Sequence, residues 1–320
     1  MNKKQTIFTA AVLAVLLAAC IVVDMTLPSY HIAITVIKKA TVYALVAVSM
    51  NLLNGFTGLF SLGQAGFMLL GAYTYAILTV PMAAKDQVYY LYGGSAVKFS
   101  LVDAFQSLFG TAGFGGAVSM ICAVLVGIVC AGLVAALFAA LIGTPVLRLK
   151  SDYLAIATLG FAEILRAIFQ WQTLGPITNG ANMLKSFPTF ADFNIKNAGG
   201  QVILRLSTFV PFLLSILCIT VIVLLIHSSY GRAFKAIRDD EVAAEAMGIS
   251  LFKHKMLSFL ISSFFSGVGG ALFAMYVSNA QAKAFTSTMT YEILLIVVIG
   301  GIGSISGSVI GTFLYVACSE

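Results

Sequence analysis

The chain has 320 residues, of which 60% are apolar and 9% are charged, and its mean hydropathy is +1.01. Soluble domains carry roughly 25% charged residues, so this composition excludes an ordinary soluble enzyme or binding domain. The net charge of +6 is explained by loops that face anionic lipid and a protein partner, and we expect no binding of nucleic acid.

Apolar runs long enough to cross a bilayer recur along the whole sequence. They occupy residues 7–23, 37–54, 59–80, 117–142, 153–170, 207–227, 257–277 and 290–318. Lipid satisfies no backbone polar group, so only helices or closed barrels span it, and the alternating segments of a barrel are absent from this sequence. We therefore predict an all-α polytopic membrane protein with about eight transmembrane helices, folded as a single transmembrane domain over residues 1–320.

The N-terminus offers two interpretations. Lys3 and Lys4 precede an apolar run that ends in Leu17-Ala18-Ala19-Cys20, a pattern that resembles a lipoprotein signal with a cysteine acceptor. Multispan proteins commonly begin with an uncleaved helix, so we favour a first span that is retained in the protein.

Lysine and arginine set the orientation that we expect. If residues 1–6 are cytoplasmic, the inner loops are residues 1–6, 143–152 and 228–256. These loops hold nine Lys and Arg residues in 45 positions. The outer side holds eight over about twice that length, counting Lys38 and Lys39, which we expect to snorkel toward the outer interface. The loops 82–116 and 172–206 then face outward.

Two apolar stretches are interrupted by glycine in a similar way. Residues 58–62 read Gly-Leu-Phe-Ser-Leu and residues 301–305 read Gly-Ile-Gly-Ser-Ile, so both fit G-[LI]-x-S-[LI]. By analogy with secondary transporters, such segments in the two halves of a chain indicate broken helices beside a substrate route. The alternative is that Gly and Ser let helices approach closely. The pathway candidates in these segments are Ser61, Gly63, Gln64, Gly66, Gly301 and Ser304.

Glu163 and Arg166 are charged residues inside an apolar run. They lie three positions apart, on one face of a helix. An isolated charge at the middle of a bilayer costs at least about 2.5 kcal/mol, so the two side chains must pair or face a wet cavity. A structural pair and a functional pair both fit this pattern. With Asn179, from the outer loop 172–206, they complete the candidate translocation residues.

Charge is concentrated in one stretch, residues 229–255. It holds nine of the 30 charged residues (18 basic and 12 acidic). Asp239 or Asp240 is placed to cap a short helix that ends at Gly248. Such a helix suits docking into a groove on a cytoplasmic partner, and the alternative is a solvated loop with intrahelical ion pairs. The candidate residues of this coupling loop are Arg232, Arg238, Asp239, Asp240, Glu241, Ala244, Glu245 and Gly248.

Several motifs, in order, resemble the permease subunits of branched-chain amino acid ABC importers, and the LivM type more than its LivH partner. They are LNGFTGLFSLGQAGFMLLGAYTYAIL (residues 53–78), SDYLAIATLGFAEILRAIF (151–169), TNGANML (178–184), GRAFKAIRDDEVAAEAMGI (231–249), KMLSFLISSFFSGVGGALFAMY (255–276) and VVIGGIGSISGSVIG (297–311). The resemblance covers most of the chain from about residue 40 onward, and the ordered set is more specific than any one glycine-rich run.

The resemblance implies a function and a set of partners. EVAAEAMGI (residues 241–249) would be the cytoplasmic loop that contacts an ATP-binding subunit. The chain would assemble with two ATP-binding subunits and a second, LivH-like permease in the bacterial cytoplasmic membrane, and would meet an extracytoplasmic substrate-binding protein. The sequence lacks a GxxxxGK[ST] phosphate loop, so we expect ATP and Mg on the partner subunits, and no cofactor or metal on this chain.

The sequence departs from that family at its end. Members usually continue with further apolar sequence after the segment that ends at Gly311, whereas this sequence stops at Glu320. The 14 residues from Gly307 onward form about 21 Å of helix, which is short of a hydrocarbon core of about 30 Å. Either a shortened chain or a half-span packed inside the protein fits.

Three classes of function are compatible with a polytopic membrane protein. An ABC importer permease for branched-chain amino acids, without catalytic residues of its own, fits best, and related importers of urea or short amides look similar. A stand-alone secondary transporter should carry more intramembrane acids than Glu163. An integral membrane enzyme should carry HExxH, GxSxG or paired carboxylates inside its spans, and the apolar runs contain none of these.

Overall fold

The computed structural model describes residues 31–110, 113–147, 151–196 and 202–320. The first apolar run (7–23) and the residues Lys3, Lys4, Cys20, Arg148 and Lys150 lie outside this part of the chain. Within it the chain is almost entirely helical. The exception is one pair of short antiparallel strands, β1 (Ile195–Lys196) and β2 (Val202–Leu204). The predicted all-α class of a polytopic membrane protein is confirmed.

Within the described residues, five helices are long and apolar enough to cross a membrane. They are α2 (Ile32–Asn51, extended by a π-helical turn Leu52–Phe56), α6 (Gly113–Val146), α7 (Ser151–Gln170), α9 (Phe209–His227) and α12 (Leu251–Val277). Three shorter apolar helices accompany them: α3 (Gln64–Thr79), α13 (Ser287–Gly300) and α14 (Ile305–Ser319). The run 290–318 is therefore two helices, and the helix of run 59–80 begins only at Gln64. Helices α3 and α14 each begin after a predicted glycine interruption.

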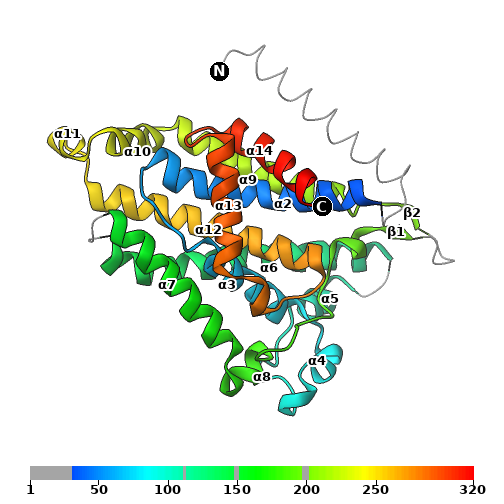
Figure 1. Cartoon of the computed structure of the whole chain (residues 1–320). Coiled ribbons are helices and arrows are strands. Elements are labelled where there is room, and N and C mark those ends of the chain that lie inside the picture. Colours follow the sequence, from blue (N-terminus) through cyan, green and yellow to red (C-terminus); the bar gives the residue numbers. More distant parts are fainter. Residues whose placement is uncertain (1–30, 111–112, 148–150, 197–201) are drawn as a thin grey trace.

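The remaining helices are short and lie near the ends of the long ones. They are α4 (Met82–Val88), α5 (Leu101–Phe109), α8 (Gly175–Thr178), α10 (Ser229–Asp239), α11 (Glu241–Ala246) and 3-10 turns at Tyr90–Tyr92, Gln172–Leu174, Phe190–Phe193 and Ala282–Ala284. Figure 1 shows α10 and α11 at the upper left, far from α4 and α8 at the bottom. We name the two regions the α11 end (residues 229–250) and the α8 end (residues 81–110, 171–196 and 278–286).

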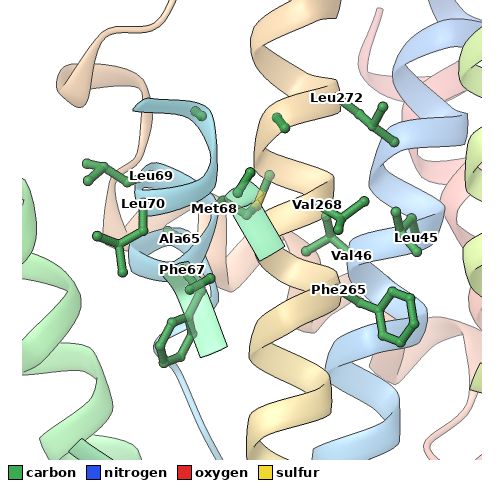
Figure 2. Close-up of a cluster of buried hydrophobic side chains, with 14 of the residues drawn as sticks. Leu45, Val46, Ala65, Phe67, Met68, Leu69, Leu70, Phe265, Val268 and Leu272 are labelled. Carbon is green, nitrogen blue, oxygen red and sulfur yellow. The ribbon is translucent and has the colours of Figure 1, made fainter. Parts of the chain in front are cut away.

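Helix α12 forms the centre of the bundle and packs against α2, α3 and α6. Figure 2 shows Met68 of α3 on one side of α12 and Leu45 and Val46 of α2 on the other. Helices α3 and α12 approach so closely that a β-carbon added at Gly71 would collide with the carbonyl of Gly267. Small residues drive such contacts in membranes, because lipid tails supply no hydrophobic force that pushes helices together.

The peripheral helices expose apolar side chains along one face. In α6, Leu133, Leu137 and Leu141 are 56%, 61% and 65% exposed, and their spacing of four places them on one side of the helix. Helix α9 exposes Leu217 and Leu224 in the same manner. An apolar face of this extent suits contact with lipid, in agreement with a multi-pass membrane protein.

Candidate coupling surface and translocation segments

Helix α11 is a short helix closed at both ends by its own sequence. The Asp240 side chain accepts hydrogen bonds from the N–H groups of Val242 (2.9 Å) and Ala243 (3.1 Å), so Asp240 is the N-cap. At the other end, Gly248 has a φ of +84°, and the N–H of Ile249 donates to the carbonyl of Ala244 at 3.1 Å. This is a Schellman ending with Gly248 as the C′ residue. The predicted capped helix is confirmed.

The coupling segment (residues 229–248) is held to the bundle at a few points. Helix α10 buries Phe234 and Ile237, and Ala244 is the buried residue of α11. Glu241 of α11 pairs with Lys255 of α12 at 2.6 Å. On the free side, Val242 and Met247 are 78% and 83% exposed. Large apolar side chains at the tip of a charged, capped helix form a surface suited to a protein partner.

The other predicted coupling residues are divided between the surface and the bundle. Arg232 and Glu245 are exposed. Arg238 is also exposed, and its side chain points at the end of α2, where its Nη1 donates to the carbonyl of Gly55 at 3.1 Å. Asp239 accepts from the same guanidinium at 2.8 and 3.1 Å.

The end of α2, just before the first glycine interruption, meets the second interruption in space. Asn51, one turn before Gly55, accepts from the N–H of Gly303 at 2.8 Å and donates to the carbonyl of Ser304 at 2.9 Å and to Ser308 at 2.7 Å. Both interruptions precede a helix, and Ser304 caps α14 by accepting from the N–H of Gly307 at 3.1 Å. No pattern in the sequence singles out Asn51 as the residue that joins them.

Side chains from other helices satisfy the backbone at the start of α3. The N–H of Leu62 donates to Thr158 of α7 at 3.0 Å, and the N–H of Ala65 donates to Thr290 of α13 at 3.2 Å. Irregular backbone at membrane depth requires such partners, because lipid offers none. Sequence analysis missed both threonines, since a Thr in an apolar run resembles any other small residue there.

The predicted pathway residues near the start of α3 are buried. Ser61 and Gln64 are 0% and 1% exposed. Gln64 lies in a polar cluster with Ser49, Ser262 and Ser266, in which Ser262 donates to the Ser49 carbonyl at 2.7 Å and Ser266 donates to Gln64. Gly63 and Gly66 lie against α7, where an added β-carbon would be 3.2 Å from Thr158 and 2.9 Å from Ala162, respectively. Close packing therefore explains both glycines.

Glu163 and Arg166 form the pair that their spacing predicts. Arg166 contacts the Glu163 carboxylate at 2.7 and 2.8 Å, and the two side chains are 35% and 33% exposed. The other carboxylate oxygen accepts from the N–H of Ser287 at 3.2 Å. Glu163 thus binds the positive N-terminal end of α13. The charges compensate each other and remain partly accessible.

Asn179 lies apart from these residues, at the α8 end. It has a φ of +60°, and its Nδ2 donates to the carbonyl of Met183 at 3.0 Å. Its Oδ1 is buried and has no hydrogen-bond partner among the described residues. The structure therefore brings Gly301 and Ser304 together at Asn51, whereas Gln64, Glu163 and Asn179 each have other partners.

The sequence matches known permeases over nearly its whole length. Residues 32–320 match the family described as branched-chain amino acid transport system / permease component. LivM of Salmonella typhimurium, a permease protein of a high-affinity branched-chain amino acid transport system, is 30% identical over 337 residues, which cover 99% of this chain and 68% of that protein. LivM of Escherichia coli is 31% identical over 87% of this chain and 61% of its own length.

A LivH permease is similar over a smaller part of the chain. LivH of Methanocaldococcus jannaschii, a branched-chain amino acid transport permease, is 30% identical over 125 residues, which cover 39% of this chain and 38% of that protein. No solved structure matches the chain. Because one family accounts for residues 32–320 and for the helical architecture, the chain belongs to the permease components of branched-chain amino acid transport systems.

Proposed function

We propose that this chain is the LivM-type membrane subunit of an ATP-driven importer, and that it forms part of the route for branched-chain amino acids across the bacterial cytoplasmic membrane. The family match over residues 32–320 carries the proposal. The substrate class comes from the names of the relatives. The alternative function is therefore that of a related importer of urea or short amides. Because inner loops are rich in Lys and Arg, the α11 end and the N-terminus are cytoplasmic.

The energy comes from partner subunits that bind ATP and Mg. Two ATP-binding subunits serve the complex, one docked on this chain and one on a LivH-like second permease. Val242 and Met247 are 78% and 83% exposed, and these apolar side chains support a docking role for α11. In a loop that stays in water, exposed apolar side chains would contribute no stabilisation. This chain hydrolyses no ATP itself.

The α8 end receives the extracytoplasmic substrate-binding protein. A pocket of about 360 Å³ opens there, and its lining is Gln87, Val88, Tyr90, Leu91, Asn179, Asn182, Met183, Lys185 and Ser186. Tyr90 and Leu91 are 70% and 56% exposed beside it. Asn179 lies at this pocket, and its buried Oδ1 has no hydrogen-bond partner among the described residues.

The route runs beside the broken helices. Glu163 and Arg166 face it with the exposed third of their side chains. Ser61, Gly63, Gln64, Gly66, Gly301 and Ser304 shape the helix ends that border it. Paired charges and backbone satisfied by side chains fit a polar path through lipid.

Reconstitution of the whole complex tests the proposal. The permease pair and both ATP-binding subunits are placed in proteoliposomes, and leucine uptake and ATP hydrolysis are measured with and without the binding protein. We expect leucine uptake that requires ATP and all subunits. Uptake of urea or acetamide in place of leucine would reassign the substrate, and ATP-independent uptake by this chain alone would indicate a secondary transporter.

A further inference from the structure

Arg238 lies at the end of α10 and reaches both the turn that ends α2 and the second glycine interruption. Its Nη1 donates to the carbonyl of Gly55 at 3.1 Å. An added β-carbon at Gly58 would lie 3.0 Å from the Arg238 Cγ, and one at Gly303 would lie 3.4 Å from Nη1. Asp239 fixes the guanidinium from the other side at 2.8 Å. The side chain, which is 39% exposed, therefore lies between α10 and the two interruptions.

The carbonyl that Arg238 binds is chemically suited to a cation. Gly55 lies in the π-helical turn that ends the Ile32–Phe56 helix. Carbonyls of a last turn lack intrahelical partners and carry the negative end of the helix dipole. Lys235, one turn earlier on α10, adds a cation–π contact with Phe56, at 5.7 Å from the ring centre. Two basic residues of α10 thus bind the end of α2.

The second interruption is attached to the same turn. The Asn51 side chain joins α2 to Gly303, Ser304 and Ser308 through three hydrogen bonds of 2.7 to 2.9 Å. Gly55 itself leaves no room beside Gly303, because an added β-carbon would lie 2.5 Å from the Gly303 nitrogen. The end of α2, the interruption before α3 and the interruption before α14 therefore form one packed unit, which we name the break node (residues 51–58 and 301–304).

We propose that Arg238 is the positioning residue that couples the docked α10–α11 segment to the break node, so that both interruptions move together when the ATP-binding subunits close. This inference rests on the proposed function. A planar guanidinium holds the Gly55 carbonyl and Asp239 at the same time with fixed geometry, whereas a lysine ammonium is a point charge on a flexible stem. A displacement of α10 is thereby transmitted to the start of α3 and of α14.

The test compares Arg238→Gln and Arg238→Lys in the complete reconstituted complex, with Lys253→Gln as the control. Lys253 is an exposed lysine near the same end, so the control removes one positive charge without touching the break node. We expect Arg238→Gln to keep its ATP-binding subunits and its basal ATP hydrolysis. Its leucine uptake per ATP hydrolysed should fall by about tenfold or more, and Arg238→Lys should fall less.

A double variant tests whether the node acts as one unit. If Arg238 works through Asn51, then Arg238→Gln combined with Asn51→Ala should lose no more uptake per ATP than the worse single variant. Multiplied losses in the double variant would mean that the two residues act independently and would overturn the proposal.

Each result has a separate meaning. An unchanged uptake per ATP in Arg238→Gln overturns the role of Arg238 and leaves the proposed function standing. Loss of the ATP-binding subunits in that variant also overturns it, because Arg238 would then be a docking residue. If Arg238→Gln does not insert, the same ratio in Arg238→Lys decides, and an unchanged ratio overturns the proposal. A wild-type complex without ATP-dependent uptake refutes the proposed function instead.

Discussion

The two ends of the bundle are built in opposite ways. At the α11 end, caps that lie within a few residues of one another close a short helix, and few contacts bind it to the bundle. At the α8 end, irregular backbone is held by side chains of α3 and α4. Tyr75 of α3 donates to the carbonyl of Pro188 at 2.7 Å, and Lys85 of α4 donates to those of Val97 and Phe99. The α11 end is therefore a locally stabilised helix with few contacts to the bundle, and the α8 end is fixed to the bundle by hydrogen bonds.

This contrast has a physical reason. A helix closed by its own caps keeps its shape when it is displaced, which suits an element that transmits motion. Loops held by buried hydrogen bonds to a rigid bundle cannot shift without leaving polar groups unsatisfied. Burial also lowers the pKa of Lys85, although Asp103 opposes that change. The four predictions that follow probe the two ends, from the largest expected effect to the smallest.

Disrupting the C-terminal cap of α11 should abolish the coupling between substrate binding and ATP hydrolysis. An added β-carbon at Gly248 meets nothing within 4 Å, so Gly248→Val acts only through the φ of +84°, which costs an L-residue about 1 kcal/mol or more. We expect normal abundance in the membrane but no ATP hydrolysis stimulated by substrate and binding protein. The double reversal Glu241→Lys and Glu245→Lys should do the same, since it also breaks the pair with Lys255.

A matched glycine at the other end serves as the control for this prediction. Gly110, which ends α5, has a φ of +91° and equally open surroundings. Gly110→Val should therefore leave stimulated ATP hydrolysis intact. Full stimulation of ATP hydrolysis in Gly248→Val would show that α11 is only a solvated loop. An equal loss of stimulation in both variants would show that the assay reports general misfolding.

Loss of a hydrogen bond that holds the α8 end should lower the stability of the protein. Tyr75→Phe removes the donor to Pro188 and leaves a buried carbonyl unsatisfied, at a cost of about 1–3 kcal/mol. We expect a lower unfolding temperature for the detergent-solubilised complex, with stimulated ATP hydrolysis retained below that temperature. Tyr90→Phe, at a position that is 70% exposed, should leave the unfolding temperature unchanged. A loss of coupling without a loss of stability in Tyr75→Phe would contradict the contrast between the ends.

Polar replacements on the free side of α11 should weaken docking moderately. Val242→Ser and Met247→Gln each remove apolar surface that we expect to be buried against an ATP-binding subunit, a loss of about 1 kcal/mol or a fivefold weaker Kd. Binding of the ATP-binding subunit to the solubilised permease pair measures this effect. Leu108→Gln, at a position of α5 that is 74% exposed, should leave that Kd unchanged, and equal weakening there would contradict the prediction.

Cysteine labelling should sharpen the assignment of sides with almost no effect on transport. In a background without native cysteines, Lys185→Cys should react with an impermeant thiol reagent added outside the cell. The bound substrate-binding protein should protect it from the reagent. Lys253→Cys should react only after the membrane is permeabilised. Labelling of position 185 from the cytoplasm alone would invert the whole topology.

Much of this protein can be predicted from local sequence. The apolar runs alone predict the helical membrane class, because every backbone group in lipid needs a partner within its own segment. The capped helix before Gly248 follows from Asp240 and glycine at their fixed spacing. The pairing of Glu163 with Arg166 follows from their separation by three residues on one helix. Each of these features depends on residues within a turn or two of each other.

Only the tertiary structure decided which distant segments meet. Arg238 binds Gly55 across 183 positions, and Asn51 binds Gly303 across 252. The sequence predicts that both glycine segments interrupt helices, and it cannot predict that they form one node. It also cannot separate the buried Gln64 from the partly exposed Glu163 and Arg166, since all three lie in apolar runs. Partner choice at long range depends on how whole helices pack, and small residues permit close approach without specifying the partner.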